Sequence, residues 1–190
     1  QFRNHEGKIV ASSELTDEDM TDIGSAIPKF TYGITLNLEY KGFDFTAFGT
    51  GVAGNKIFNI LYRADSPLRN SLKYYMDNAW TPENKGASMP AVNNVATDLN
   101  FWSSSAAMFN GSYFKIKQLQ LGYTLPKRLT QKVAIKDLRF FVSLDDFFTF
   151  SNYPGMDPET ATTGNNGGAG FDIGSYPTMK KCSFGASFSF

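Results

Sequence analysis

The sequence predicts an all-β fold, a part of a transmembrane antiparallel β-barrel with long extracellular loops. The first observation behind this prediction is strict alternation of apolar and polar residues, which gives each strand one face suited to lipid and one suited to water. The second is composition, because aromatic residues make up 15% of the 190 residues while the mean hydropathy is only -0.28. The third is that no stretch approaches the roughly 20 continuous apolar residues of a membrane helix.

The last expected strand, residues 179–190, is the most informative segment. It ends on Phe190, and small or polar residues separate the side chains of Phe184, Phe188 and Phe190, which share one face and are expected to contact lipid. This ending is typical of the closing strand of an outer-membrane barrel. A soluble edge strand could show the same alternation, so the other strands must decide between the two interpretations.

Two strands are expected at 31–41 and 43–50, with a tight reversal at Lys41-Gly42 between them. The first alternates without error, and the residues of its apolar face are expected to contact lipid: Tyr32, Ile34, Leu36, Leu38 and Tyr40. At about 3.3 Å per residue, the two tyrosines at the ends of this face lie roughly 26 Å apart, which suits the aromatic girdles of a membrane barrel.

Two more strands, 113–125 and 137–150, bring the number to five. In the first, Phe114 is in opposite phase to Leu121, and one extra residue near 117–118 would restore a single apolar face. The sequence therefore predicts a β-bulge there. In the second, four residues are expected to face lipid: Leu138, Phe140, Val142 and Leu144.

The orientation of the loops follows if Phe190 lies at the periplasmic side. Alternation then places Gly42 and residues 126–136 in the periplasm, and the three long segments outside the cell: residues 1–30, 51–112 and 151–178. Short inner turns and long outer loops are what such barrels show. A short helix is expected around 68–78 within the second long loop.

Composition argues against several other classes of protein. Eighteen basic and eighteen acidic residues cancel, so the sequence predicts no nucleic-acid partner. A single cysteine, Cys182, excludes an intrachain disulfide and a thiolate zinc cluster. The chain opens on Gln1 without a basic start and an apolar run, so no signal peptide is in view and processing or truncation is expected to have made this N-terminus.

The residues that could carry catalysis do not form a recognisable site. His5 is the only histidine, and no Gly-x-Ser-x-Gly elbow supplies a nucleophile. Asp145 and Asp146 are adjacent on an expected strand and should point to opposite faces, which spoils them as a glycosidase pair. The glycine spacing of residues 49–54 follows an antiparallel hairpin and so does not fit a dinucleotide site. We expect neither enzyme activity nor a cofactor.

Three groups of residues follow one another in a characteristic order. They are Ile27-Pro28-Lys29-Phe30-Thr31-Tyr32-Gly33-Ile34 leading to Tyr40-Lys41-Gly42-Phe43-Asp44, then Tyr113-Phe114-Lys115-Ile116-Lys117 with Leu121-Gly122-Tyr123-Thr124-Leu125-Pro126, and Gly155-Met156-Asp157-Pro158-Glu159. Together with the terminal Phe, they resemble the C-terminal barrel region of the SusC/RagA family of TonB-dependent outer-membrane transporters. The resemblance covers nearly all of the chain.

This resemblance implies a multi-pass protein of the outer membrane, whose 22-stranded barrel is occluded by a plug. It implies import of oligosaccharides or peptides, with a SusD-like surface lipoprotein as a lid and TonB as the source of energy. The chain would supply the last five strands of that barrel. It carries neither the plug nor the segment that contacts TonB, and five strands cannot close a barrel, since small barrels need about eight.

Loop residues offer two candidate binding sites. Sugar faces and peptide side chains stack on aromatic rings, so five loop aromatics are candidate substrate contacts: Tyr74, Tyr75, Trp80, Phe101 and Trp102. The alternative is that they pack the loop onto itself or onto the lid. The first loop resembles a calcium-binding segment of the family, but only Asn4, Glu6, Asp17 and Asp19 are visible ligands, and a solvated loop without a metal is expected.

Two other functions are consistent with parts of the pattern. A soluble β-sandwich that binds glycans would need a second sheet to cover the apolar face. A secreted glycan hydrolase would need a carboxylate whose mutation abolishes turnover.

Overall fold

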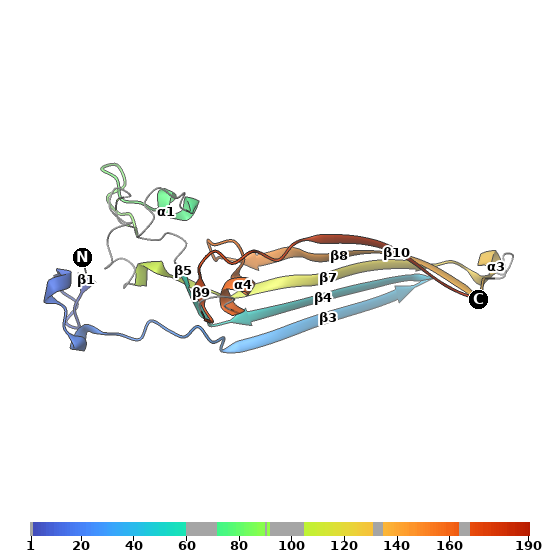
Figure 1. The fold of residues 1–190 in the computed structure, drawn as a ribbon, viewed down its shortest axis with the longest axis horizontal. Helices are drawn as coiled ribbons and strands as arrows, with labels where there is room; N and C mark the ends of the chain where they lie inside the picture. The colour runs from blue at the N-terminus through green and yellow to red at the C-terminus, as the bar shows by residue number, and fades with distance from the viewer. Residues whose placement is uncertain (1, 60–71, 90, 92–104, 131–134, 164–167) are drawn as a thin grey trace.

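The structure, a computed structural model, describes residues 2–59, 72–89, 91, 105–130, 135–163 and 168–190. Its main feature is a five-stranded antiparallel sheet in the order β10-β8-β7-β4-β3 (Figure 1). The strands of this main sheet are β3 (Phe30–Tyr40), β4 (Phe43–Ala53), β7 (Tyr113–Thr124), β8 (Asp137–Ser151) and β10 (Lys181–Ser189). Each strand pairs with the next one along the chain, so the main sheet is an up-and-down meander.

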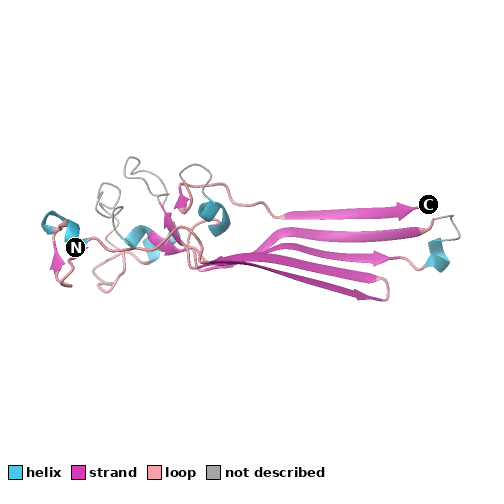
Figure 2. Ribbon diagram, turned by 90° about the horizontal axis from the view of Figure 1, so that it is seen from below, coloured by secondary structure: helices cyan, strands magenta, loops and turns pink. Residues whose placement is uncertain are grey.

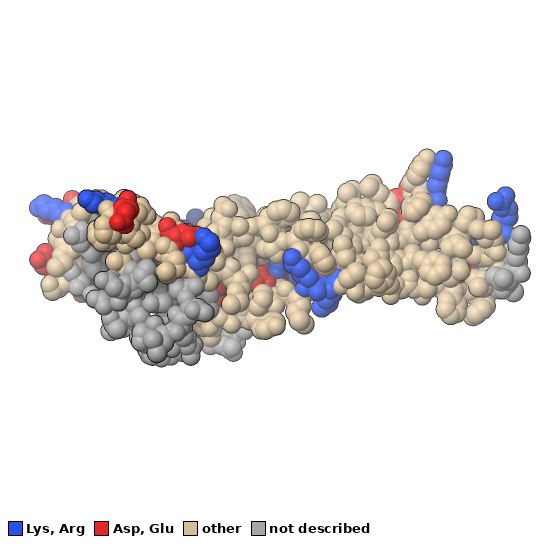
Figure 3. All heavy atoms as spheres, turned by 90° about the horizontal axis from the view of Figure 1, so that it is seen from above, with Lys and Arg blue, Asp and Glu red and all other residues tan. Residues whose placement is uncertain are grey.

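The main sheet is one layer thick over most of its length, as Figure 2 shows. The N-terminal segment and the long connections gather at one end of the strands, and the β3–β4 turn, α3 (Lys127–Thr130) and the C-terminus lie at the other (Figure 1). On the face drawn in Figure 3, residues other than Lys, Arg, Asp and Glu cover most of the main sheet. Acidic and basic side chains together are most numerous at the loop end, and a few basic ones lie farther along the sheet and at the turn end. One end of the main sheet therefore carries the long connections, and the other carries short turns and the C-terminus.

A second, small sheet lies at the loop end, where the sequence predicts only irregular connections. Its order is β6-β5-β9, with β5 (Lys56–Asn59), β6 (Met108–Asn110) and β9 (Phe171–Asp172). The pairing of β5 with β9 is parallel and joins the two long connections to each other. Strands of two to four residues are too short to show a period of two, which is why the sequence pattern missed them.

The remaining elements are short. They are β1 (Phe2–Arg3), β2 (Ile9–Val10), the 3₁₀ turns η1 (Ser12–Glu14), η2 (Asp17–Asp19) and η3 (Ser105–Ala107), α1 (Lys73–Asp77) and α4 (Pro158–Thr163). The helix expected around 68–78 corresponds to α1 in its described part, and residues 68–71 lie outside the described residues.

Apolar side chains form continuous rows across one face of the main sheet. One row, set by the pairing register, is Leu38, Phe45, Leu121, Val142 and Phe184. The next row towards the turn is Tyr40, Phe43, Tyr123, Phe140 and Ala186. We call this side the apolar face. It is open, since Leu38 is 54% and Phe184 82% exposed.

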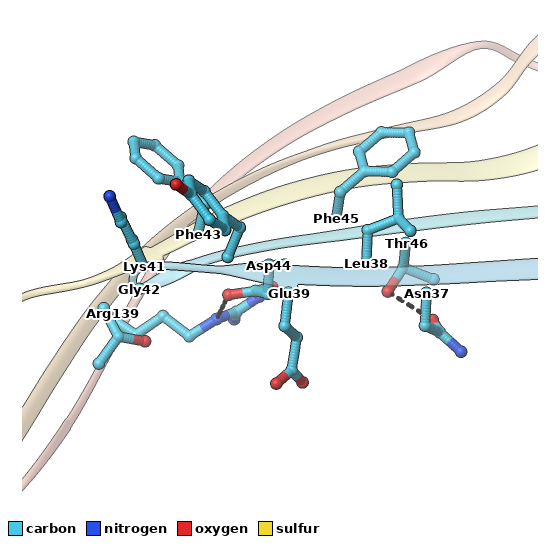
Figure 4. Close-up of a pocket in the computed structure, with 12 residues that line it drawn as sticks. Asn37, Leu38, Glu39, Lys41, Gly42, Phe43, Asp44, Phe45, Thr46 and Arg139 are labelled. Carbon is cyan, nitrogen blue, oxygen red and sulfur yellow. Dashed lines mark hydrogen bonds and ion pairs between the residues drawn. The ribbon is translucent and has the colours of Figure 1, made fainter.

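The opposite side, the polar face, carries a different set of rows. The row behind Leu38 is Asn37, Thr46, Gln120, Ser143 and Ser183. Figure 4 shows the separation at the β3–β4 hairpin, where Asn37, Glu39 and Asp44 point to one side of the strands and Phe43 and Phe45 to the other. The alternation read from the sequence therefore holds across all five strands, because their registers agree.

The predicted β-bulge is confirmed. Between β4 and β7 the register skips one residue, so that Phe48 and Gly49 face Gln118 and Ile116, and Lys117 is the extra residue. Between β7 and β8 it skips again, with Asp146 and Phe147 together opposite Lys117. The apolar rows continue on both sides of this double bulge because the extra residues absorb the change of phase.

The bulge corrects one expectation. Adjacent strand residues normally point to opposite faces, but Asp146 has a φ of 56° and breaks the alternation. Asp145 accepts a hydrogen bond from Ser143 on the polar face, and Asp146 accepts one from Lys117. The expectation that these two carboxylates lie on opposite faces was therefore wrong.

The turn between β3 and β4 has the conformation that a two-residue hairpin requires. Lys41 and Gly42 both have positive φ, 47° and 88°, as in a type I′ turn, whose twist matches that of the strands. Just beyond this turn, Arg139 of β8 reaches across β7 to Asp44 of β4, with Nε–Oδ1 and Nη2–Oδ2 distances of 2.8 and 2.5 Å. The ion pair passes over Gly122, where a Cβ atom would collide with both side chains.

Deletion of Lys117 tests the role of the bulge. Without the extra residue, residues 113–116 change phase relative to the rest of β7, which moves Phe114 to the polar face. We expect the deletion to make the main sheet of the intact protein sensitive to protease, whereas Lys117→Ala, which keeps the chain length, should leave it resistant. Equal protease resistance of the two variants would contradict this role.

The close approach at Gly122 gives a second prediction. Gly122→Ala should lower the free energy of unfolding by about 1–2 kcal/mol, because the added methyl group displaces the Asp44–Arg139 pair. Gly33→Ala is the matched control, since a Cβ there meets its neighbours at 3.7 Å or more. The measurement is the midpoint of urea unfolding, and equal midpoints for the two variants would refute the argument.

Candidate functional site

A buried group of charges joins the main sheet to the loop end. The Lys115 side chain of β7 lies on the polar face and is 1% exposed as a residue. Its Nζ donates to Asp157 at 3.0 Å (Oδ1) and 2.8 Å (Oδ2), and to Glu159 Oε2 at 2.7 Å. A buried ammonium is tolerated only when it is paired in this way.

Lys117 extends the group through the bulge. Its Nζ donates to Asp146 Oδ1 at 2.8 Å and to Glu159 at 2.9 Å, so Glu159 links the two lysines. Thr178 completes the group, because its hydroxyl accepts from Lys115 at 2.6 Å and donates to Asp157. We call these residues the charge cluster: Lys115, Lys117, Asp146, Asp157, Glu159 and Thr178.

The local sequence explains why the charge cluster forms. Asp157 is the N-cap of α4, and its Oδ1 accepts the backbone N–H of Glu159 at 3.0 Å. Pro158 occupies the first helical position, where no hydrogen bond from its nitrogen is needed. Glu159 follows in the first turn, which the helix dipole favours. The Asp-Pro-Glu segment thus starts a helix and aims two carboxylates at β7.

The surroundings of Asp157 favour its charged form. Burial by itself would raise the pKa of this carboxyl, but hydrogen bonds from Lys115 and Thr178 outweigh it and hold the pKa below its ordinary value. The charge cluster holds two positive and three negative side chains, all engaged in ion pairs. It can fix the position of a segment, and its groups contact one another rather than an open cavity.

A second buried group holds the small sheet together. Ile57, Tyr153 and Ala161 pack as a core under α4. The hydroxyl of Tyr153 donates to Asp172 at 2.5 Å and accepts from Asn59 at 2.8 Å, and burial raises the pKa of this tyrosine. Asn59 belongs to the connection between β4 and β7, and Asp172 to the connection between β8 and β10. This buried group therefore links the two connections.

The candidate substrate-binding aromatics have different surroundings. Tyr75 is buried and packs edge-on against Tyr74 and Phe109. Trp80 is exposed and remains open to a ligand. Phe101 and Trp102 lie outside the described residues. The surroundings of Tyr75 match the alternative that these rings pack the loop, and substrate contact stays a prediction.

One candidate ligand of the N-terminal loop, Asp19, is engaged in contacts within the loop. Asp19 Oδ1 accepts from the backbone and the ring Nδ1 of His5, both at 2.8 Å, and Oδ2 accepts from the backbone N–H of Thr16. Hydrogen bonds from Thr16 and His5 hold the pKa of Asp19 far below its usual range. Within the described residues, no group of three acidic, histidine or cysteine side chains is arranged to hold a metal.

A groove of about 690 Å³ surrounds the β3–β4 turn (Figure 4). Its lining includes Leu38 and Phe45 of the apolar face together with Glu39 and Asp44 of the polar face. Because it wraps around the end of the sheet, it does not enclose a ligand. Among the described residues, no helix is both long and apolar enough to span a membrane.

Sequence reasoning missed the charge cluster, although a signal was present. Lys115 and Lys117 are the charged residues of an alternating strand whose other residues are uncharged, and Asp157-Pro158-Glu159 has the pattern of a helix start. The sequence does not reveal that these two segments meet, because 42 residues separate Lys115 from Asp157.

Comparison with known proteins identifies sequence relatives along almost the whole chain. The chain is 33% identical over 187 residues to TonB-dependent receptor P3 of Formosa agariphila, a match that covers 94% of the chain and 18% of the relative. It is 25% identical over 182 residues to TonB-dependent receptor P26 of the same organism, again covering 18% of the relative. The chain thus spans about a fifth of the length of these relatives, both of which are named as receptors. No family model matches the chain.

Solved structures give the same result for the fold. The RagAB peptide importer in its 'open-open' state is 26% identical, with a TM-score of 0.70, and the match covers 95% of this chain and 19% of that one. The 'closed-closed' state of the same importer has a TM-score of 0.70 at 23% identity, covering 98% and 20%. The resemblance that the motifs predict is confirmed: over almost its whole length, the chain matches a segment of the TonB-dependent outer-membrane transporters of the SusC/RagA family.

Proposed function

We propose that the chain forms five neighbouring strands in the wall of a closed outer-membrane β-barrel of about 22 strands, and that the whole protein is a nutrient importer. The observation that carries the proposal is the set of apolar rows. Side chains such as Leu38, Phe45 and Phe184 make the apolar face continuous from strand to strand, and none of the described segments covers this face. Exposing an apolar face that runs across five strands to water would be strongly unfavourable, whereas the hydrocarbon chains of a membrane can cover it.

The dimensions of the strands support the proposal. β3 and β4 each have 11 residues, which corresponds to roughly 36 Å at about 3.3 Å per residue. A tilt of about 45° reduces the height to roughly 26 Å, close to the apolar band of membrane barrels. Tyr32 and Tyr40 lie near the two ends of this band and serve as its aromatic girdles.

The edges of the main sheet also support a barrel with more strands than this chain supplies. β3 and β10 are the outer strands of the main sheet, and each pairs with only one described strand. Backbone groups without partners are not tolerated in the hydrocarbon core, so a membrane sheet must close on itself. Further strands of the whole protein would complete it.

The same proposal assigns the two ends of the sheet. Segments 1–30, 51–112 and 151–178 lie outside the cell, and the turns at Gly42 and 126–136 face the periplasm. The gathering of the long connections at one end supports this assignment (Figure 1). The twelve residues expected to face lipid come from β3, β8 and the C-terminal segment that contains β10, and they then contact the bilayer. Strands β4 and β7 add Phe45 and Leu121 from the same rows.

Import is proposed for the whole protein. The related RagAB structures are described as a peptide importer, which supports peptides, with oligosaccharides as the other substrate class of the family. A SusD-like surface lipoprotein would cover the outer mouth, and TonB would act through regions outside this chain. Of the five proposed substrate contacts, Tyr74, Tyr75 and Trp80 lie in the described part of the chain, and Trp80 is the exposed one among these three.

Cys182 offers a direct test, because it lies on the apolar face while Ser183 lies on the polar face. In the intact protein, with other cysteines replaced, a nitroxide label on Cys182 should collide with oxygen, which concentrates in lipid, far more than with a water-soluble nickel chelate. A label at Ser183→Cys in a Cys182→Ser background should show a much lower ratio. Equal nickel access at the two positions would rule out the proposed barrel wall.

A further inference from the structure

Resting on the proposed barrel, we propose that the described residues of the β8–β10 connection are folded into the pore and narrow its outer mouth, held there by Lys115 and Lys117. We call its described residues, 152–163 and 168–178, the latch segment. The charge cluster lies on the polar face of the main sheet, and this places the latch segment on the same side.

The direction of the Lys115 side chain shows on which face of the main sheet the latch segment lies. Lys115 pairs with Thr50 of β4 and Thr149 of β8 in one row. Its neighbour Phe114 points to the apolar face, where its ring stacks with Tyr32 and Phe150. Lys115 therefore points to the polar face, and α4, which supplies its carboxylate partners, lies over that face. In a closed barrel the polar face lines the lumen.

The charge cluster holds the latch segment at both ends. Asp157 lies near its beginning, and Thr178 is its last residue. The backbone N–H of Thr178 donates to Asp157 Oδ2 at 3.0 Å, and Lys115 contacts both side chains. The two ends are thus fixed at one point on β7, which closes the segment into a loop over the lumen.

Burial makes this attachment costly to break. Asp157 is 5% and Lys115 1% exposed, so little water can reach either group to replace its partner. Removing the charge of one partner leaves the other buried without compensation, so the contact breaks rather than weakens. The latch segment has a second attachment, to β5 through Ile57 and Asn59. Loss of the charge cluster is therefore expected to release the part of α4 that the carboxylates hold to β7, rather than the whole segment.

The first test changes only the latch side. Asp157→Asn combined with Glu159→Gln removes both carboxylate charges, while asparagine still caps α4. The matched control is Lys73→Met with Asp77→Asn, which removes an exposed i,i+4 ion pair on α1. In the intact protein in its membrane, we expect amide hydrogen exchange of residues 158–163 to rise by about tenfold or more in the test variant and to stay unchanged in the control.

The strands supply the internal comparison. Amides of β7 and β8 should keep their protection in the test variant, because their ladder hydrogen bonds are untouched. Unchanged exchange of residues 158–163 would overturn the inference, and so would an equal rise throughout β7 and β8, since the charge cluster would then support the wall rather than hold a latch.

A second measurement tests whether the latch segment narrows the mouth. Thr50→Cys in a Cys182→Ser background places a thiol in the same row as Lys115. With the latch intact it should react with N-ethylmaleimide but only slowly with a PEG-maleimide, and the Asp157→Asn, Glu159→Gln change should speed the PEG reaction severalfold. Rapid PEG labelling before the change would overturn the narrowing.

The two proposals fail in different ways. If the chain is not a barrel wall, the nitroxide labels at positions 182 and 183 have equal access to nickel, whatever the exchange of the latch segment. If the wall is correct and the latch is not, the labels differ and the exchange of residues 158–163 does not respond.

Discussion

The structure depends on the agreement of register among five strands. Each strand alternates apolar and polar residues. Only the alignment of the five strands with one another joins these patterns into one apolar face and one polar face. A slip of one residue in any strand would place its apolar side chains on the polar face. The row from Leu38 to Phe184 is the outcome of four correct registers. The tight turn at Lys41-Gly42 sets the first of them, and the long connections leave the others to be chosen by side-chain matching.

The double bulge reconciles this constraint with the charge cluster. A regular β7 could not carry both Phe114 and Leu121 on the apolar face, and the extra residue Lys117 solves this problem. The same irregularity turns Asp146 onto the polar face beside Lys117. One local departure from strand geometry therefore keeps the apolar face continuous and adds an ion pair to the charge cluster at the loop end. Bulges often redirect side chains in this way.

Sequence reasoning succeeded where the pattern is local. Alternation placed the long strands, and the phase change between Phe114 and Leu121 located the bulge. It failed where structure depends on contacts between distant segments: β5, β6 and β9 are too short to show a period, and their pairing joins separate connections. The charge cluster was missed for the same reason. Asp146 shows a further limit, because a positive φ cannot be read from an aspartate in a strand.

The central claim is that hydrocarbon chains, and not another layer of protein, contact the apolar face. A phospholipid with a photoreactive diazirine in its acyl chain, incorporated into membranes that contain the intact protein, tests this claim most directly. After irradiation, mass spectrometry should find lipid adducts on Phe45, Leu121 and Phe184 and none on Thr46 or Gln120. Adducts spread equally over both sets, or absent from the first, would contradict the account.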